Sequence, residues 1–356
     1  MKRIVLTGGG TAGHVSPNQA LIPHLLKEGW DIHYIGTKNG IERTLIEPMQ
    51  GVTYHAVSSG KLRRYFSLQN FTDPFRVIKG FGEARKLIKS LKPDVIFSKG
   101  GFVSVPVVLA GKRCKVPVII HESDMTPGLA NKLAIPSAVK VCCNFPETLD
   151  ALPEGKAVLT GSPIRQELLT GDKDAARKMC GFTDEKPVIL VIGGSLGAVA
   201  VNEAVRAALP ELLKQFQIIH LCGKGKVDDS LKEIKGYCQF EYIKNELRDL
   251  FALADVVISR AGANAICELL ALRKPNLLIP LSARASRGDQ ILNAHSFERQ
   301  GFSLVIEEEQ LTNATLLDAV HNLYENREQF INAMHNSGQQ DPIATIIGLI
   351  EEAATK

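Results

Sequence analysis

The chain has 356 residues, and at roughly 150 residues per domain this length predicts two domains with sizeable cores. Apolar residues form 45% of the chain and charged residues 22%, which excludes global disorder, and a formal net charge of +4 is too small to indicate nucleic-acid binding. Seven cysteines with no Cys-x-x-Cys pair, and an amino terminus without a signal-peptide pattern, predict a cytoplasmic protein with reduced thiols. The longest apolar runs are too short to cross a bilayer.

Short β-branched runs alternate with helical patterns along the chain. Buried strands are predicted at residues 4–7, 32–35, 95–98, 118–121, 139–142, 188–192, 217–221, 240–243, 256–259, 276–279 and 303–306. This regular alternation predicts an α/β protein with parallel sheets.

One part of this pattern occurs twice. Residues 4–36 run strand, glycine loop, helix and strand, and residues 188–223 repeat that order. We therefore predict two Rossmann-like domains, residues 1–162 and 163–340, which meet at a proline-bearing turn. The strand C-termini of both sheets would face a central cleft that holds the ligand.

The glycine loops indicate where an anion binds. Gly8-Gly9-Gly10-Thr11-Ala12-Gly13-His14 lies between a strand and an amphipathic helix expected at residues 18–28, and loops that begin at Gly193 and Arg260 occupy similar places. Backbone N–H groups and the helix dipole favour an anion at such a loop. A single Gly-Gly pair is more often a tight turn, but its repetition at equivalent places favours a phosphate site.

The first loop also fits the Gly-x-Gly-x-x-Gly fingerprint, so an NAD-dependent oxidoreductase is an alternative. That fingerprint requires an acidic residue at the end of the second strand, where this chain has Gly36-Thr37-Lys38. In the second half, Glu268 follows Gly262 by six residues, about one and a half helical turns, which places a carboxylate near a bound phosphate. A sugar nucleotide is therefore favoured over a nicotinamide cofactor.

Further motifs follow in a fixed order over nearly the whole chain: Gly100-Gly101-Phe102-Val103-Ser104, His121-Glu122, Gly128-Leu129-Ala130-Asn131-Lys132, Gly193-Gly194-Ser195, Arg260-Ala261-Gly262-Ala263, Asp289-Gln290 and Asn293-Ala294. With the first glycine loop, they make the chain resemble the MurG family of bacterial glycosyltransferases, which add N-acetylglucosamine (GlcNAc) to lipid I in peptidoglycan synthesis. The resemblance implies the GT-B architecture. The donor UDP-GlcNAc would be held mainly by the C-terminal domain, and a last helix within residues 341–356 would pack back on the N-terminal, acceptor-binding domain.

The resemblance also implies the reaction. GlcNAc would pass, with inversion, from UDP-GlcNAc to the C4 hydroxyl of the N-acetylmuramic acid (MurNAc) of lipid I, which is undecaprenyl-pyrophosphoryl-MurNAc-peptide, and the product would be lipid II. The protein would act at the cytoplasmic face of the cell membrane. A diacylglycerol glycosyltransferase of the same fold and a noncatalytic sugar-nucleotide sensor remain as alternatives.

Carried over residue by residue, the resemblance implies donor contacts at Thr11, Ala12, Gly13, Asp124, Arg165, Ser195, Ile243, Ala263, Asn264, Ala265, Ile266, Cys267, Glu268 and Gln290. Three sites depart from the usual family pattern: Ala12 replaces a glycine, Leu196 replaces a glutamine, and Ser123-Asp124 stands where Gln-Asn is usual. The last departure brings a negative charge to a place where the family has a neutral amide near the sugar.

The attacking hydroxyl must lose a proton, and a general base contributes about 10²–10⁴-fold to such a step. His14 is the candidate base, because the positive end of the expected helix would disfavour its charged form. Its alternative role is to donate to a phosphate or a backbone carbonyl. Glu122 is the reserve candidate.

No metal or cofactor held by the protein is expected, although a free divalent cation could assist the reaction. The Asp-x-Asp pattern at residues 172–174 precedes a helical stretch, so Asp172 is predicted to cap that helix. His24, His55, His220 and His321 lack the spacing of metal ligands and are expected in core or surface roles.

A membrane-contacting segment is predicted at residues 62–81. Residues 61–92 hold nine basic residues against two acidic ones, an excess larger than that of the whole chain, with aromatic residues interleaved. Such a surface suits anionic headgroups. The contacts are predicted at Arg63, Arg64, Phe66, Phe71 and Phe75, whereas residues 83–91 are expected to form an ordinary amphipathic helix that packs on the sheet.

Overall fold

The computed structural model describes residues 1–60, 69–183, 186–194, 197–243, 245–285, 288–338 and 341–355, with side chains of the third helix described from Arg76 onward. The chain divides into two units. The first comprises Met1–Arg165 with Gln339–Lys356, and the second comprises Gln166–Gly338. Each is described by itself below.

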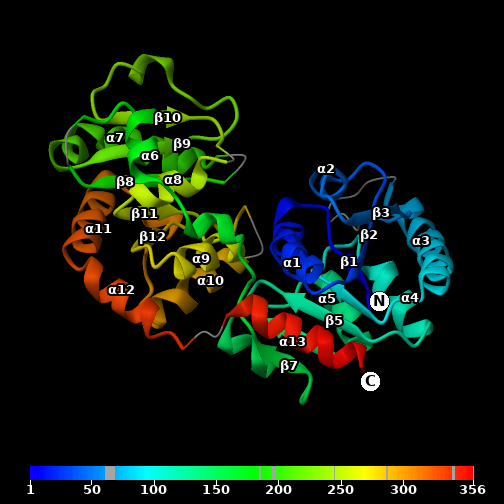
Figure 1. Ribbon diagram of the computed structural model, residues 1–356. Helices are drawn as coiled ribbons and strands as arrows, with labels where there is room; N and C mark the ends of the chain where they lie inside the picture. Colours follow the sequence, from blue (N-terminus) through cyan, green and yellow to red (C-terminus); the bar gives the residue numbers. More distant parts are fainter. Residues whose placement is uncertain are drawn as a thin grey trace. The chain divides into compact units, whose positions relative to one another are not determined.

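The first unit is built on a parallel sheet in the order β3-β2-β1-β4-β5-β6-β7 (Figure 1). Its strands are β1 Arg3–Thr7, β2 Asp31–Gly36, β3 Val52–Ala56, β4 Val95–Ser98, β5 Val118–Glu122, β6 Lys140–Cys143 and β7 Ala157–Leu159. Its helices are α1 Ser16–Lys27, α2 Ile41–Ile46, α3 Gln69–Leu91, α4 Val105–Arg113, α5 Leu129–Ala134 and α13 Pro342–Ala354.

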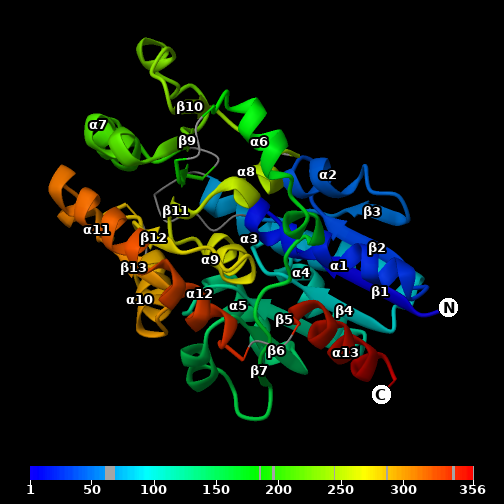
Figure 2. The same ribbon diagram turned by 60° about the vertical axis from the view of Figure 1, so that its left-hand side comes forward.

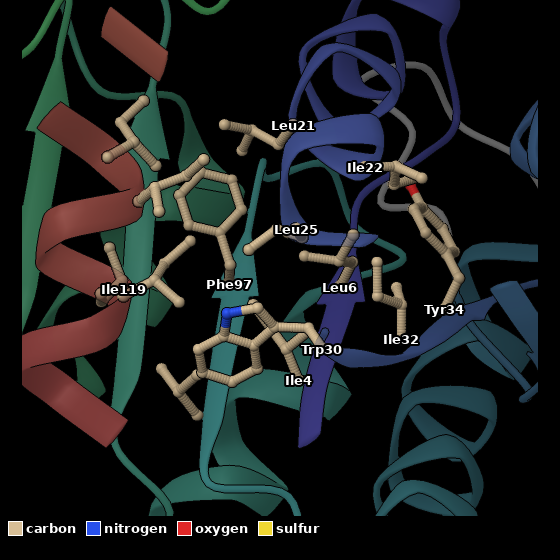
Figure 3. Close-up of a cluster of buried hydrophobic side chains, with 14 of the residues drawn as sticks. Ile4, Leu6, Leu21, Ile22, Leu25, Trp30, Ile32, Tyr34, Phe97 and Ile119 are labelled. Carbon is tan, nitrogen blue, oxygen red and sulfur yellow. The ribbon is translucent and has the colours of Figure 1, made fainter. Parts of the chain in front are cut away.

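Helices cover both faces of this sheet, because successive residues of each strand point to opposite sides. Ile4 and Leu6 face a cluster that includes side chains of α1 and α13, whereas Val5 faces the opposite cluster with α3 and α4. Figure 3 shows the first cluster, with Leu21 and Leu25 of α1 beside Phe97 of β4.

The last helix, α13, belongs to the first unit although it follows the second in sequence. Ile343, Ile346 and Ile350 are buried in the cluster with α1, and the Trp30 indole N–H donates to Glu351 over 2.9 Å. Asp341 caps the helix, since its carboxylate accepts from the N–H groups of Ile343 and Ala344.

The second unit repeats the plan with a parallel sheet in the order β10-β9-β8-β11-β12-β13 (Figure 2). Its strands are β8 Val188–Ile192, β9 Gln217–Leu221, β10 Tyr237–Phe240, β11 Val256–Ser259, β12 Asn276–Leu278 and β13 Ser303–Val305. Its helices are α6 Lys173–Met179, α7 Val199–Gln215, α8 Leu247–Leu253, α9 Ala263–Ala271, α10 Asp289–Arg299, α11 Asn313–Glu325 and α12 Arg327–His335.

The predicted repeat is confirmed by the two sheets. β1 lies between β2 and β4, and β8 lies between β9 and β11, so β1-α1-β2 and β8-α7-β9 occupy equivalent places. In each sheet the strand order reverses between two neighbouring strands, which are β1 and β4 in the first sheet and β8 and β11 in the second. Open α/β sheets bind their ligands at the carboxyl ends of the strands beside such a reversal.

Some predicted boundaries are wrong. The strand expected at residues 240–243 is β10, Tyr237–Phe240, because buried Tyr237 pairs with Ile218 whereas Glu241 and Tyr242 are exposed. Edge strands β3 and β7 were not predicted, since neither carries a continuous buried apolar run. The helix expected at residues 18–28 begins earlier, as α1 has Pro17 in its first turn.

The basic segment is only partly described. Helix α3 is continuous from Gln69 to Leu91, and Ala84 and Ile88 are buried on the sheet, as expected for residues 83–91. Arg63, Arg64 and Phe66 lie outside the described residues, as do the side chains of Phe71 and Phe75. Within the described part of the chain, no helix combines the length and apolar character that a membrane crossing needs.

Candidate active site

The first glycine loop leaves the carboxyl end of β1 and is held by two buried side chains. The Tyr34 hydroxyl donates to the Gly8 carbonyl over 2.7 Å, and the Asn18 amide donates to the Thr7 carbonyl over 3.3 Å. Both residues are fully buried, and burial raises the pKa of Tyr34 above its usual range. The carbonyls of the loop are therefore fixed from inside the unit.

One N–H group of this loop donates to a buried carboxylate of the protein itself. Glu42 is fully buried, and it accepts from the Gly10 N–H over 3.1 Å and from the Thr37 N–H over 2.9 Å. This role of Glu42 was not predicted from the sequence, because the residue lies in α2 and not at the end of β2, where the fingerprint places its acidic residue. Part of the anion-binding capacity expected of the first loop is thus used by the protein itself.

His14 ends a 3₁₀ turn, Ala12–His14, that separates the glycine loop from α1. His14 therefore lies two residues before α1, which begins at Ser16. Its ring is half-buried, and Nδ1 lies 3.0 Å from the Thr11 hydroxyl. This hydrogen bond orients the imidazole at the edge of the sheet.

The second glycine pair packs against the first loop. Gly101 has a φ of 81°, and a Cβ added there would collide with the Gly9 carbonyl and lie 3.3 Å from His14 Nδ1. Gly100, with a φ of 89°, lies against the Asn131 amide in the same way. These glycines are required where the loops after β1, β4 and β5 approach one another.

Glu122 organises the turn that follows β5. One oxygen accepts from the Asp124 N–H over 3.0 Å, and the other accepts from the Gly128 N–H and from the Asn131 amide over 3.1 and 2.8 Å. Burial is the largest cause of the raised pKa of Glu122. Its carboxylate thus shapes the turn in which Asp124 lies.

In the second unit, the site residues cluster at the N-terminus of α9. Gly262, the N-cap residue of this helix, lies in extended backbone and has no side chain that could cap the first turn. Glu268 lies half-buried on the same helix. The predicted residues from Ala263 to Glu268 are therefore brought together on one helix at the carboxyl end of β11.

Two neighbouring segments support this helix end. The Arg260 guanidinium donates to the Ile279 and Pro280 carbonyls and pairs with Glu308, which fixes the loop before α9. Buried Asn293 of α10 donates to the Ala261 carbonyl over 3.3 Å. Arg260 and Asn293 stood in the sequence motifs, but only their contacts show that they position the loop.

The remaining donor-binding predictions are distributed over several segments. The Gln290 amide oxygen accepts from the Leu281 N–H over 3.0 Å, so only its NH₂ group could donate to a sugar hydroxyl. Ile243 is half-buried after β10. Ser195 lies outside the described residues. Thr11, Ala12, Gly13, Asp124 and Arg165 belong to the first unit.

The other singled-out polar residues have structural roles. Asp172 caps α6 as predicted, since it accepts from the Asp174 and Ala175 N–H groups. His220 is a core residue, with its ring nitrogens 2.9 Å from the Tyr237 hydroxyl and the Asn202 amide oxygen, and burial lowers its pKa to about 3. Among the residues described, no group of three or more His, Cys, Asp or Glu side chains could hold a metal ion.

Comparison with protein families decides the assignment. The model of the glycosyltransferase family 28 N-terminal domain matches residues 4–143, and the model of its C-terminal domain matches residues 188–347. The chain belongs to glycosyltransferase family 28. The first matched segment covers β1 to β6 of the first sheet, and the second covers the whole second sheet, β8 to β13.

Relatives within family 28 match the whole chain. The UDP-N-acetylglucosamine--N-acetylmuramyl-(pentapeptide) pyrophosphoryl-undecaprenol N-acetylglucosamine transferase of Lachnoclostridium phytofermentans is 67% identical over 100% of both chains. The enzyme of the same name from Clostridium tetani is 58% identical over 99% of both chains. These identities confirm the resemblance on which the sequence analysis relied.

Solved structures agree on the fold. The crystal structure of Acinetobacter baumannii MurG is 25% identical, covers 99% of this chain and 100% of its own, and has a TM-score of 0.78. The kitacinnamycin glycosyltransferase is 15% identical, covers 99% of each chain, and has a TM-score of 0.76. The predicted GT-B type of α/β fold is therefore confirmed.

Proposed function

We propose that this protein transfers GlcNAc from UDP-GlcNAc to the C4 hydroxyl of MurNAc in lipid I and so forms lipid II. The observation that carries the proposal is the 67% identity, over the full length of both chains, to a transferase named for this reaction. Neither alternative, a diacylglycerol glycosyltransferase or an NAD-dependent oxidoreductase, is favoured by relatives of this kind.

The second unit would hold the donor. The N-termini of α9 and α7, whose N-cap residues Gly262 and Ala198 have no polar side chain, suit the two phosphates of UDP, because backbone N–H groups and the helix dipole favour an anion there. Glu268 would accept hydrogen bonds from the ribose hydroxyls, and Ile243 would present backbone groups to uracil. Arg165 and Ser195 complete the proposed diphosphate contacts.

The first unit would hold the acceptor and move the proton. The C4 oxygen of MurNAc forms a bond to the anomeric carbon of GlcNAc while the bond from that carbon to UDP breaks, and the hydroxyl proton passes to a base. His14 is proposed as that base, because Thr11 orients its ring beside the loop after β4. Glu122 is less suited, since both its oxygens are engaged within its own turn.

We further propose that the protein acts at the cytoplasmic face of the cell membrane without crossing it, and that residues 62–81 supply the contact. The described end of this segment is consistent with such a surface, as Ile78 of α3 is 67% exposed. Binding to phosphatidylglycerol vesicles should fall when Arg63 and Arg64 are both changed to Ser, or when salt is raised. Co-sedimentation unaffected by either change would contradict this part of the proposal.

The transfer itself is tested by a single-turnover assay with radiolabelled UDP-GlcNAc, with and without a short-chain lipid I analogue. We expect the label in a disaccharide lipid and stoichiometric release of UDP only when the muramyl lipid is present. Diacylglycerol and a nicotinamide cofactor with a 2-hydroxy acid serve as the matched alternative substrates. Label transferred to diacylglycerol instead, or turnover of the nicotinamide cofactor alone, would overturn the proposal.

A further inference from the structure

A buried lysine lies at the carboxyl end of β4, outside every role assigned so far. Lys99 is only 1% exposed, and its own N–H donates to the Thr7 carbonyl over 2.9 Å. Its ammonium donates to His121 Nδ1 over 2.8 Å and also contacts the Ser123 hydroxyl. Burying a charge is costly unless the charge is paired and hydrogen-bonded, so the partners of this lysine must offset the cost of its burial.

The direction of the bond between Lys99 and His121 follows from the other side of the ring. His121 Nε2 lies 2.9 Å from the Gly161 carbonyl, which can only accept, so Nε2 carries the proton. Nδ1 then presents its lone pair to the ammonium. The ring is neutral, and burial, followed by the charge of Lys99, holds the pKa of His121 well below its usual range.

Two carboxylates follow in the same turn. Glu122 is buried, and the nearby charges act on it in opposite directions: Asp124 raises its pKa, and Lys99 lowers it. Asp124 stands where the resemblance implies a neutral amide, and Ser123, its neighbour, is a direct partner of Lys99. The buried cation therefore contacts the residue that stands between the two carboxylates, Glu122 and Asp124.

We propose that Lys99 is a positioning residue for the transfer reaction, whose buried ammonium holds the Ser123-Asp124 turn in place and balances the two carboxylates of that turn. On this view the Ser-Asp pair is compatible with the site only because Lys99 is present. The inference rests on the proposed transferase function, but the interaction itself can be measured without turnover.

A double-mutant cycle tests the charge balance. Lys99→Met keeps the volume of the side chain and removes its charge, so we expect kcat/KM with UDP-GlcNAc and the lipid I analogue to fall about tenfold or more. Adding Asp124→Asn should restore part of that loss, because the carboxylate that Lys99 balances is gone. The exposed Lys27→Met serves as the matched control and should leave kcat/KM within about twofold of the parent.

Additive losses in the double variant, or a Lys99→Met protein as active as Lys27→Met, would overturn the proposal. If Lys99→Met folds poorly, melting temperatures of the same four proteins replace the rates, and Asp124→Asn should again recover part of the loss. Imidazole ¹⁵N NMR of His121 gives a readout independent of turnover: its pKa should rise in Lys99→Met. An unchanged His121 pKa would also overturn the proposal, whereas failure of transfer by the unsubstituted protein would overturn only the proposed function.

Discussion

Glycine loops follow equivalent strands in the two sheets, but different groups surround them. In the first unit, the loops after β1, β4 and β5 are held by buried ionisable side chains, namely Glu42, Lys99 and Glu122. In the second unit, the loops before α7 and α9 lead to helices whose N-cap residues, Ala198 and Gly262, have no polar side chain. Ionisable side chains can exchange protons, whereas backbone N–H groups can bind an anion at any ordinary pH. One edge is therefore suited to proton transfer and the other to holding a diphosphate.

The sharpest test of this contrast is His14→Ala in the first unit. If His14 is the base, kcat should fall about 10²–10⁴-fold, because the attacking hydroxyl loses its proton acceptor. Steady-state kinetics measure the fall in kcat. A UDP titration checks that the affinity for UDP does not change. His24→Ala, at the other end of α1, is the matched control. Near-normal turnover of His14→Ala would remove this residue as the base.

A pair of glycine substitutions should separate packing from ligand binding. Gly101→Ala should lower the free energy of unfolding by about 2–6 kcal/mol, since a strained φ and an overpacked contact each cost about 1–3 kcal/mol. A Cβ at Gly262 meets nothing within 4 Å, so Gly262→Ala should cost about 1 kcal/mol or less. It should nevertheless weaken UDP binding, because the added methyl would occupy the space before α9.

Urea unfolding and UDP titration of both variants measure these effects. The contrast between the two sheet edges fails if Gly101→Ala is as stable as the parent, or if Gly262→Ala binds UDP normally.

Glu268→Ala should raise the dissociation constant for UDP about 10–100-fold, since hydrogen bonds to a charged group contribute about 1.5–3 kcal/mol. Isothermal titration calorimetry measures the change. Glu203→Ala on the exposed face of α7 is the matched control and should bind UDP like the parent. Equal affinities for both variants would show that Glu268 does not hold the ribose.

The last test concerns the stability of the protein in acid, which should also differ between the units. His220 has a folded pKa of about 3 against an ordinary value of 6.5, so the unfolded chain binds more protons between these values. Its contribution to stability is present above pH 6.5 and is lost as the pH falls toward 3, by about 1.4 kcal/mol per pH unit. In urea unfolding at several pH values, His220→Gln should show a shallower loss than the exposed His335→Gln control.

In the first unit, two groups change the stability in opposite directions as the pH falls. The lowered pKa of His121 acts in the same direction as that of His220, but the raised pKa of Glu122 acts in the opposite one. Stability from Glu122 is greatest while it is protonated, and it decreases as the pH rises from 4.5 toward the folded value. If His220→Gln lost stability in acid as steeply as the control, His220 would not be the source of the acid sensitivity of the second unit.

Much of the fold could be predicted because buried parallel strands are short apolar runs bounded by glycine. Strands 95–98, 188–192, 217–221 and 256–259 were predicted with the observed bounds, and all four are central or next to central in their sheets. Of the edge strands, β3 and β7 were missed and β10 was displaced, since they are less buried and their sequences resemble loops. The ordered motifs predicted the family for the same reason: loops that approach each other closely require glycine at fixed places.

The sequence by itself determined the α/β class, the duplicated strand, loop and helix unit, and the residues that line the glycine loops. Only the tertiary structure decided which groups those loops contact: Glu42 on Gly10, Lys99 on His121, and Asn293 on Ala261. These partners are 32, 22 and 32 residues apart in sequence. Local patterns report whether a residue is apolar or allows a turn, whereas the pairing of a buried charge depends on which strand ends the sheet brings together.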